Sequence, residues 1–273
     1  MGMSRTGLGV KIVSVAGAMV GLLLGTQALA ADCTPNNITL RNQAEIDNFQ
    51  ADHGPCDRIA GRLFIQNGAD ILNLDGLAAL TAINGRLRIQ NLPALANLDG
   101  LASVSGAIGR LEIKNNGSLQ TIDGLAGIRT ANNNVEVVNN PQLQNLDGLA
   151  GLTSIAQHLR LRNLPLVTNL DGLEGLTGEV AILEVESNAA LANIDGLSGI
   201  SGTSSNLELI NNRVLQDIDG LAGLRRVGGN MILRNQFLIT DIDALAGVSG
   251  PLGRLDVRGN RALVNLDGLW NVT

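Results

Sequence analysis

The sequence predicts an all-β solenoid built from about nine 24-residue coils with an N-terminal helical cap. Three observations lead to this prediction: an unbroken aspartate repeat, apolar residues that alternate at a spacing of two, and a turn motif after each aspartate. A repeat of this length buries its apolar face only against neighbouring repeats, so the coils must stack. The aspartates lie 24 residues apart without insertion or deletion: Asp75, Asp99, Asp123, Asp147, Asp171, Asp195, Asp219, Asp243 and Asp267.

Within each coil, one short segment has the pattern of a strand with one buried face. Leu87 and Ile89 are separated by a single residue, and the same spacing recurs in the later coils. We expect these strands to stack into one parallel sheet along the solenoid. The inward-facing set of the first full coil is predicted to be aliphatic, with side chains that each contribute roughly 1.5–3 kcal/mol when buried: Leu77, Leu80, Ile83, Leu87, Ile89, Leu95 and Leu98.

The aspartate repeat is interpreted first as a structural ladder. In Asp147-Gly-Leu-Ala-Gly-Leu the leucines are three apart, which predicts an N-cap aspartate followed by a helical or 3₁₀ turn. Nine stacked carboxylates are tolerable if each accepts backbone N–H bonds at the start of its own turn. The alternative is a row of calcium ions bound by oxygen ligands, but the Gly-Gly-x-Gly-x-Asp repeat of calcium-binding β-rolls is absent.

An asparagine column follows the predicted strands and predicts a second ladder. Amide side chains stacked at about 4.8 Å can hydrogen-bond in series and satisfy backbone groups where each strand leaves the sheet. Ser187 and Gly259 interrupt the column, which otherwise contains Asn67, Asn91, Asn115, Asn139, Asn163, Asn211 and Asn235.

The N-terminal region has the features of an exported protein. Residues 1–30 combine Arg5 and Lys11 with an apolar run and the cleavage pattern Ala28-Leu-Ala, so we expect a signal peptide and a mature chain that begins at residue 31. A membrane anchor is the alternative, but the run is short for a span of about 20 residues. Residues 31–58 are predicted to form the cap, which contains a helix between residues 37 and 49.

The two cysteines of the chain, Cys33 and Cys56, are expected to form a disulfide that clamps this cap to the first coil, as an even pair does in an exported protein. Two free buried thiols are the alternative. At the other end, the chain stops partway through a coil, and Trp270 is a candidate to cover that end; otherwise the sequence is a fragment or associates through it.

Charge and motif content disfavour several functional classes. Without Arg5 and Lys11, seventeen basic residues face twenty-five acidic ones, and the net charge of −8 disfavours nucleic acid and anionic lipid as partners. The histidines, His53 and His158, are too far apart in the repeat to form a metal cluster or catalytic triad. No nucleotide-binding motif is present. We therefore predict no enzyme activity, no cofactor, no metal and no membrane span after signal cleavage.

The outward positions of the predicted strands are the candidate binding surface, because residue type varies there from coil to coil. Arg160, Arg162, Glu184 and Glu186 form its charged centre and are predicted to face a protein. The alternative is a solvated sheet face, in which neighbouring opposite charges contribute about 0.2–1 kcal/mol per pair.

The stretch Cys56-Asp-Arg-Ile59-Ala-Gly61-Arg-Leu63-Phe-Ile65, together with the later Leu-x-Ile-x-Asn and Leu-x-x-Leu-Asp-Gly-Leu spacings, resembles the receptor L domain. This family is known from insulin and epidermal growth factor receptor ectodomains and from fungal cell-wall proteins. The resemblance covers about residues 33–273 and implies a right-handed parallel β-helix, with one strand ladder per face, over residues 59–273. It also implies an extracellular binding role. A leucine-rich-repeat horseshoe is the runner-up fold.

These observations predict an exported, non-enzymatic protein that recognises a protein or another envelope component in the periplasm, at the cell surface or outside the cell. A structural envelope protein without a specific ligand is the competing interpretation. A calcium- or ice-binding solenoid is a further alternative, the latter suggested by the regular Asn97-x-Asp99 type of polar array.

Overall fold

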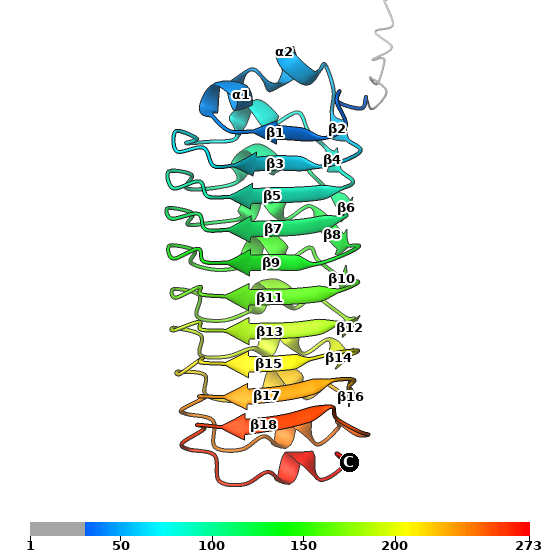
Figure 1. Ribbon diagram of the computed structural model, residues 1–273, viewed down its shortest axis with the longest axis vertical. Helices are drawn as coiled ribbons and strands as arrows, with labels where there is room; N and C mark the ends of the chain where they lie inside the picture. The colour runs from blue at the N-terminus through cyan, green and yellow to red at the C-terminus, as the bar shows by residue number, and fades with distance from the viewer. Residues whose placement is uncertain (1–30) are drawn as a thin grey trace, which may run out of the picture.

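The computed structural model describes residues 31–273, so the predicted signal peptide at residues 1–30 lies outside the described residues. The described chain forms a straight stack of coils, with two short helices at the N-terminal end (Figure 1). Strands recur about every 24 residues and pair in parallel with the coils before and after them. The predicted all-β parallel solenoid is therefore confirmed. Within residues 31–273, no helix is long and apolar enough to cross a membrane.

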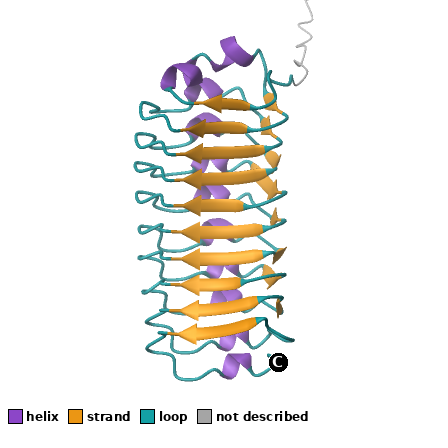
Figure 2. Ribbon diagram, viewed as in Figure 1, coloured by secondary structure: helices purple, strands orange, loops and turns teal. Residues whose placement is uncertain are grey.

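One continuous ten-stranded sheet forms the largest face of the stack (Figure 2). Its register keeps the repeat: Leu87 pairs with Leu111, and Arg160 pairs with Glu184. The predicted parallel sheet is thus confirmed. Its strands, in spatial order, are β1 (Ile38–Leu40), β3 (Leu63–Gln66), β5 (Arg86–Gln90), β7 (Arg110–Lys114), β9 (Val135–Val138), β11 (His158–Arg162), β13 (Ile182–Glu186), β15 (Leu207–Ile210), β17 (Asn230–Arg234) and β18 (Arg254–Arg258).

A second set of shorter strands is divided into three small sheets with the orders β2-β4, β6-β8-β10 and β12-β14-β16. The resemblance to the receptor L domain implied one continuous ladder of strands on each face of the solenoid. That detail is wrong, because the short strands are split into three sheets and a third face consists of 3₁₀ turns. The short strands are β2 (Arg58–Ile59), β4 (Ala82–Ile83), β6 (Gly106–Ile108), β8 (Ile128–Ala131), β10 (Ser154–Ile155), β12 (Gly178–Val180), β14 (Ile200–Thr203) and β16 (Arg226–Val227).

Each aspartate of the repeat begins a single 3₁₀ turn, and these turns stack along the solenoid. The turns are η1 (Asp75–Leu77), η2 (Asp99–Leu101), η3 (Asp123–Leu125), η4 (Asp147–Leu149), η5 (Asp171–Leu173), η6 (Asp195–Leu197), η7 (Asp219–Leu221), η8 (Asp243–Leu245) and η9 (Asp267–Leu269). The predicted 3₁₀ turn is confirmed. The predicted N-cap role of the aspartate is wrong.

The N-cap of η4 is Leu146, and no side chain caps it. Instead, the backbone N–H of Asp147 donates to Asn145 Oδ1 at 3.1 Å, and the equivalent bond recurs from Asp75 to Asp267. The residue two places before each aspartate is therefore the side-chain acceptor at the turn. The reason is geometric: the backbone N–H of an aspartate already inside the turn can donate an Asx-type hydrogen bond to the side chain two residues before it.

The coil interior is filled by aliphatic side chains, as predicted. All seven inward residues expected for the first full coil are at most 1% exposed. The glycine after the aspartate, present in every turn but η8, where Ala244 replaces it, has a different role. A Cβ on Gly148 would lie 1.9 Å from the carbonyl oxygen of Ile122 in the preceding coil. The Asp-Gly-Leu turns are therefore in backbone contact, and the absence of a side chain on glycine permits this close approach.

The predicted asparagine ladder is confirmed. Asn139 Nδ2 donates to Asn115 Oδ1 at 2.9 Å, and Asn163 donates to Asn139 in the same way. These asparagines also have positive φ values, such as 56° at Asn139, a conformation that asparagine adopts more readily than most residues. The column thus turns the chain at the end of every strand. Between Asn163 and Asn211 the column residue is Ser187, which also has a positive φ.

A second amide column, buried at every amide member except Asn260, lies one residue further along and was missed by the sequence analysis. Asn140 Oδ1 accepts from the backbone N–H of Asn116 at 3.1 Å, while Asn140 Nδ2 donates to the carbonyl of Ile113 at 3.0 Å. This inner column satisfies the turn backbone, which had been expected of the outer one. Its signal is an Asn-Asn pair after the strand in three coils, beginning at Asn115, Asn139 and Asn211. Its amide members are Asn116, Asn140, Asn188, Asn212, Gln236 and Asn260.

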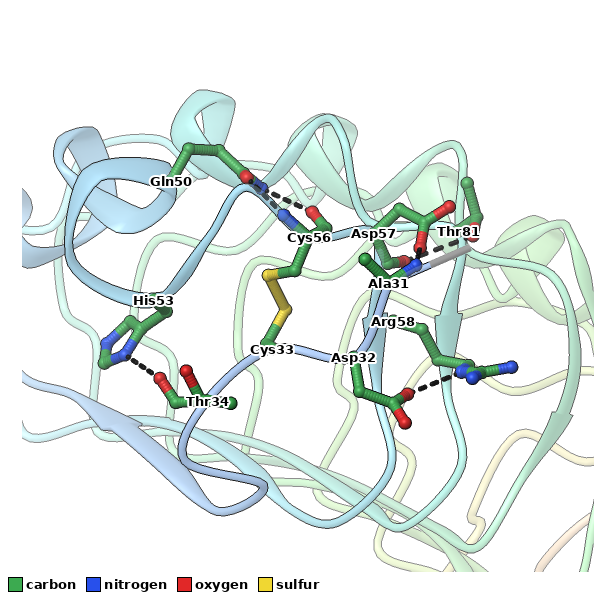
Figure 3. Close-up of a disulfide and its surroundings, with 10 residues drawn as sticks. All are labelled: Ala31, Asp32, Cys33, Thr34, Gln50, His53, Cys56, Asp57, Arg58 and Thr81. Carbon is green, nitrogen blue, oxygen red and sulfur yellow. Dashed lines mark hydrogen bonds and ion pairs between the residues drawn. A yellow bond between two sulfur atoms is a disulfide. The ribbon is translucent and has the colours of Figure 1, made fainter. Parts of the chain in front are cut away.

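The N-terminal cap contains the predicted helix as α1 (Gln43–Asp47), and a second helix, α2 (Phe49–His53), follows beyond the predicted range. Both helices pack on η1. Figure 3 shows the predicted Cys33–Cys56 disulfide, which joins the segment before β1 to the one after α2. Beside it, Gln50 Oε1 accepts from the backbone N–H of Cys56 at 3.0 Å. Disulfides are typical of oxidising, extracytoplasmic compartments.

At the C-terminal end, the expectation that Trp270 covers the last coil is wrong. Its side chain is 75% exposed, and Leu266 beside η9 is 47% exposed. A side chain with so much of its surface exposed covers little of the last coil.

Candidate functional site

The outward face of the ten-stranded sheet is the candidate site. Side chains on alternate positions of a strand point away from the core, and this face changes from coil to coil while the turns repeat. Its central column is Phe64, Arg88, Glu112, Glu136, Arg160, Glu184, Glu208, Ile232 and Asp256.

The structure brings the four predicted surface residues together. Arg160 and Arg162 lie on β11, directly beside Glu184 and Glu186 on β13. Arg160 is hydrogen-bonded to Glu184, and Arg162 Nε lies 3.1 Å from Glu184 Oε1 and 3.0 Å from Glu186 Oε2. Glu184 is only 5% exposed. The predicted charged centre therefore exists, but much of its charge is paired within the protein.

A second charged group on the same face was not singled out from the sequence. Glu112 and Glu136 are neighbours on β7 and β9, and each is 2% exposed. Glu112 Oε2 accepts from Arg88 Nε at 2.8 Å, while Arg110 and Lys114 contact both carboxylates. The sequence signal that could have predicted this group is a pair of glutamates, Glu112 and Glu136, at the same position of consecutive coils. Two carboxylates so close together repel each other unless cations lie beside them.

Arg160 joins these two groups into one network. Its guanidinium lies 3.6 Å from Glu136 Oε2 and is also hydrogen-bonded to Glu184. We call the set the central ion-pair network; it runs across β5, β7, β9, β11 and β13 and consists of Arg88, Arg110, Glu112, Lys114, Glu136, Arg160, Arg162, Glu184 and Glu186.

The two ends of the network have opposite electrostatics. Burial by itself raises the pKa of Glu136, but hydrogen bonds from Lys114, Asn134 and Arg110 outweigh it and lower the pKa to about 2. Burial also raises the pKa of Glu186, and the nearby Glu184 and Glu208 add to the increase beyond what Arg162 offsets. Cations are therefore in excess around Glu136, and carboxylates are in excess around Glu186.

The outer asparagine column lines a shallow groove along one edge of the sheet. Its lining residues include Asn115, Asn139 and Asn163 together with Pro141 and Pro165. The groove surface is mostly apolar because the amides already hydrogen-bond to one another. It contains no titratable side chain among its lining residues.

The described residues contain no group of three or more His, Cys, Asp or Glu side chains placed to hold a metal ion. His53 lies on α2 in the cap and His158 begins β11, so the structure does not bring the two histidines together. The nine aspartates of the repeat lie on the turn side of the coils. There, burial and then the neighbouring carboxylates Asp217, Asp241 and Asp195 raise the pKa of Asp219.

Comparisons with protein-family models, with curated proteins and with solved structures found no match. The function must therefore be argued from the chain itself.

Proposed function

We propose that this chain is an exported, non-enzymatic repeat protein that recognises a protein or another component of the cell envelope, in the periplasm, at the cell surface or outside the cell. The observation that carries this proposal is the contrast between fixed turns and a variable outward sheet face. Ten strands hold that face in register, so its side chains form a preorganised pattern that requires little ordering on binding. The resemblance to receptor L domains supports the same role.

The central ion-pair network gives this face its specificity. Glu186 is the most exposed carboxylate of the network and Arg162 its most exposed cation, with side chains 22% and 38% exposed. A partner with complementary charges would orient against these two side chains, because charged groups across an interface chiefly set orientation and association rate. Buried members such as Glu136 fix the positions of the cations around them.

A structural envelope protein without a specific ligand is the second candidate, and one observation favours it. Glu112, Glu136 and Glu184 are neutralised by cations of the protein itself. A face that satisfies its own charges needs no partner. The network would then hold consecutive coils together in the same way as other cross-strand charge pairs.

A fourfold alanine variant separates the two candidates. We expect replacement of Arg160, Arg162, Glu184 and Glu186 to abolish capture of specific components from a native envelope extract. The matched control replaces Arg129, Glu174, Glu179 and Arg226, which are exposed elsewhere and alter the net charge equally. Thermal melting checks that both variants are folded. Identical capture by the wild-type protein and the first variant would favour the structural candidate.

A further inference from the structure

Near the N-terminal cap, the outward face of the ten-stranded sheet carries cations that the protein leaves without a close carboxylate. Arg62 is exposed, its Nε donates to Asn37 Oδ1 at 3.2 Å, and no carboxylate of residues 31–273 lies within ion-pair distance of it. Arg86 has Glu112 as its carboxylate neighbour, at 3.9 Å, beyond hydrogen-bond reach. Both guanidinium groups can therefore pair with carboxylates of another molecule.

Further along the same face, carboxylates are left without enough cations. Glu208 on β15 accepts from Asn206 Nδ2 at 3.0 Å, and within the described part of the chain no basic side chain lies within ion-pair distance of it. Glu186 on β13 shares Arg162 with Glu184. Burial raises the pKa of Glu186, and Glu184 and Glu208 raise it further. An added cation would therefore be favourable at this end of the face.

The two regions carry opposite charge on one continuous sheet. Residues 62–66 and β5 together contain three arginines and no acidic residue, whereas β13 and β15 together contain three glutamates and no basic residue. Most of the central ion-pair network lies between them, on β7, β9 and β11. A molecule that matches this face must therefore carry the reverse pattern, with its acidic and basic groups the same distance apart.

A second copy of the chain carries that reverse pattern when its solenoid axis runs in the opposite direction. Two identical faces can pack about a twofold axis with their solenoid axes either parallel or antiparallel. The parallel arrangement brings the arginine-rich strands of both copies together, and likewise the glutamate-rich strands, so like charges repel. The antiparallel arrangement places β3 and β5 of each copy over β13 and β15 of the other. Arg62 and Arg86 then face Glu186 and Glu208, and the twofold axis repeats this contact.

The overlap is large enough for a specific, reversible contact. The stack is straight and its ten-stranded face is unbroken (Figure 1), so two such faces can lie against each other. The antiparallel overlap runs from β3 to β15 in each copy, over strands of four or five residues. At about 4.8 Å per strand and 3.3 Å per residue, this gives roughly 500 Å² of sheet from each copy, or roughly 1,000 Å² in total, which is the lower limit for a specific interface.

We propose that the chain forms a twofold-symmetric dimer through the outward sheet face, with antiparallel solenoid axes and with Arg62 and Arg86 of each copy against Glu186 and Glu208 of the other. The dimer covers the central ion-pair network, so a second copy and an envelope component would compete for the same face. Because dimerisation is measured on purified protein alone, its failure is distinct from a failure of the envelope-capture experiment.

The test is sedimentation velocity of the purified protein over a range of concentrations. For the wild type we expect a dimer whose fraction rises with protein concentration and falls with added salt. The Arg62→Glu/Arg86→Glu variant makes both ends of the face acidic, and the Glu186→Arg/Glu208→Arg variant makes both ends basic. Each variant alone should dimerise at least about tenfold more weakly than the wild type, because like charges then meet at both contacts.

An equimolar mixture of the two variants gives the sharpest result. In a mixed pair, an acidic end meets a basic end at both contacts, so we expect a heterodimer that neither variant forms alone. The control variant Arg129→Glu/Arg226→Glu reverses two exposed charges on β8 and β16, which lie outside the ten-stranded sheet, and should dimerise like the wild type. Thermal melting verifies that all variants are folded.

Three results would overturn the proposal. A wild-type protein that stays monomeric over the whole concentration range would leave this face to a different molecule. A dimer that both charge reversals leave unaltered would place the contact on another surface. A mixture of the two variants that yields no heterodimer would show that opposite ends of two faces do not meet.

Discussion

The Asp-Gly-Leu turns and the outward face of the ten-stranded sheet belong to the same coils, yet their sequences behave in opposite ways. The turns repeat almost without change, with Ala244 as the one departure at the glycine position. The outward face includes aromatic, aliphatic, acidic and basic residues at equivalent positions. The difference follows from what each region contacts. The turns contact the backbone of the neighbouring coil, whereas the side chains of the outward face contact solvent and one another.

A backbone contact permits few residues, whereas a side-chain contact can be satisfied in several ways. At Gly148 a methyl group would collide with the preceding carbonyl. On the sheet, by contrast, two adjacent glutamates are accommodated by cations from both flanking columns. Binding specificity can therefore vary on the outward face without affecting the stacking of the turns.

The largest expected effect comes from a methyl group in the turn. We predict that Gly148→Ala lowers the free energy of unfolding by roughly 3 kcal/mol, at the upper end for overpacking, because the new Cβ would lie 1.9 Å from Ile122 O. Chemical denaturation measures the change. The control is Gly117→Ala, whose nearest neighbours would be 3.9 Å away. Equal stability of the two variants would contradict the proposed backbone contact.

An intermediate effect is expected at the inner amide column. We predict that Asn140→Ala lowers the free energy of unfolding by about 2 kcal/mol, because the buried N–H of Asn116 and the carbonyl of Ile113 lose their partner. Asn139→Ser, in the outer column, should cost less, since Ser187 already occupies an equivalent position. The same denaturation measurement compares them, and a larger loss for Asn139→Ser would reverse the assigned roles.

The smallest effect is a change in pH dependence on the outward face. The pKa of Glu136 is about 2 in the folded protein, against 4.5 for an ordinary glutamate. Its contribution to stability is therefore present above pH 4.5 and declines as pH falls towards 2. We predict that Glu136→Gln reduces this acid-dependent loss of thermal stability. A melting-temperature profile across that range measures it, and an unchanged slope would contradict the prediction.

The pKa of Glu186 is shifted in the opposite direction to that of Glu136, so the same experiment should give the opposite pH dependence. Its raised pKa means that its ionised form is disfavoured in the folded protein, so its contribution falls as pH rises through the folded pKa. Glu186→Gln should therefore leave the acid limb of the profile intact and slightly raise stability at neutral pH. A matching loss of acid dependence in both variants would indicate that the two ends of the network are not electrostatically distinct.

Local patterns predicted the repeating parts of the structure well. Alternating leucines and isoleucines located the strands, and the asparagines after them located the turns, because both signals lie within a few residues of one another. The prediction that the aspartate caps its turn was wrong because the 3₁₀ turn has Leu146 as its N-cap, one residue earlier than predicted. Asp147 then lies inside the turn, and Asn145 provides the side-chain acceptor in its place. The inner column was missed because its positions are irregular in sequence, with Leu92 and Leu164 at two of them and Gln236 at a third.

By itself, the sequence determined the period, the aliphatic interior, the parallel sheet and the cap with its disulfide, because each depends on spacing along the chain or on residue type. Only the tertiary structure decided how charges on neighbouring coils pair. Glu112 and Glu136 are buried by cations that reach them from other strands, and Arg62 and Arg86 are left with donors to spare. The physical reason is that ion pairing depends on distances across coils, which side-chain directions set only after the coils have stacked.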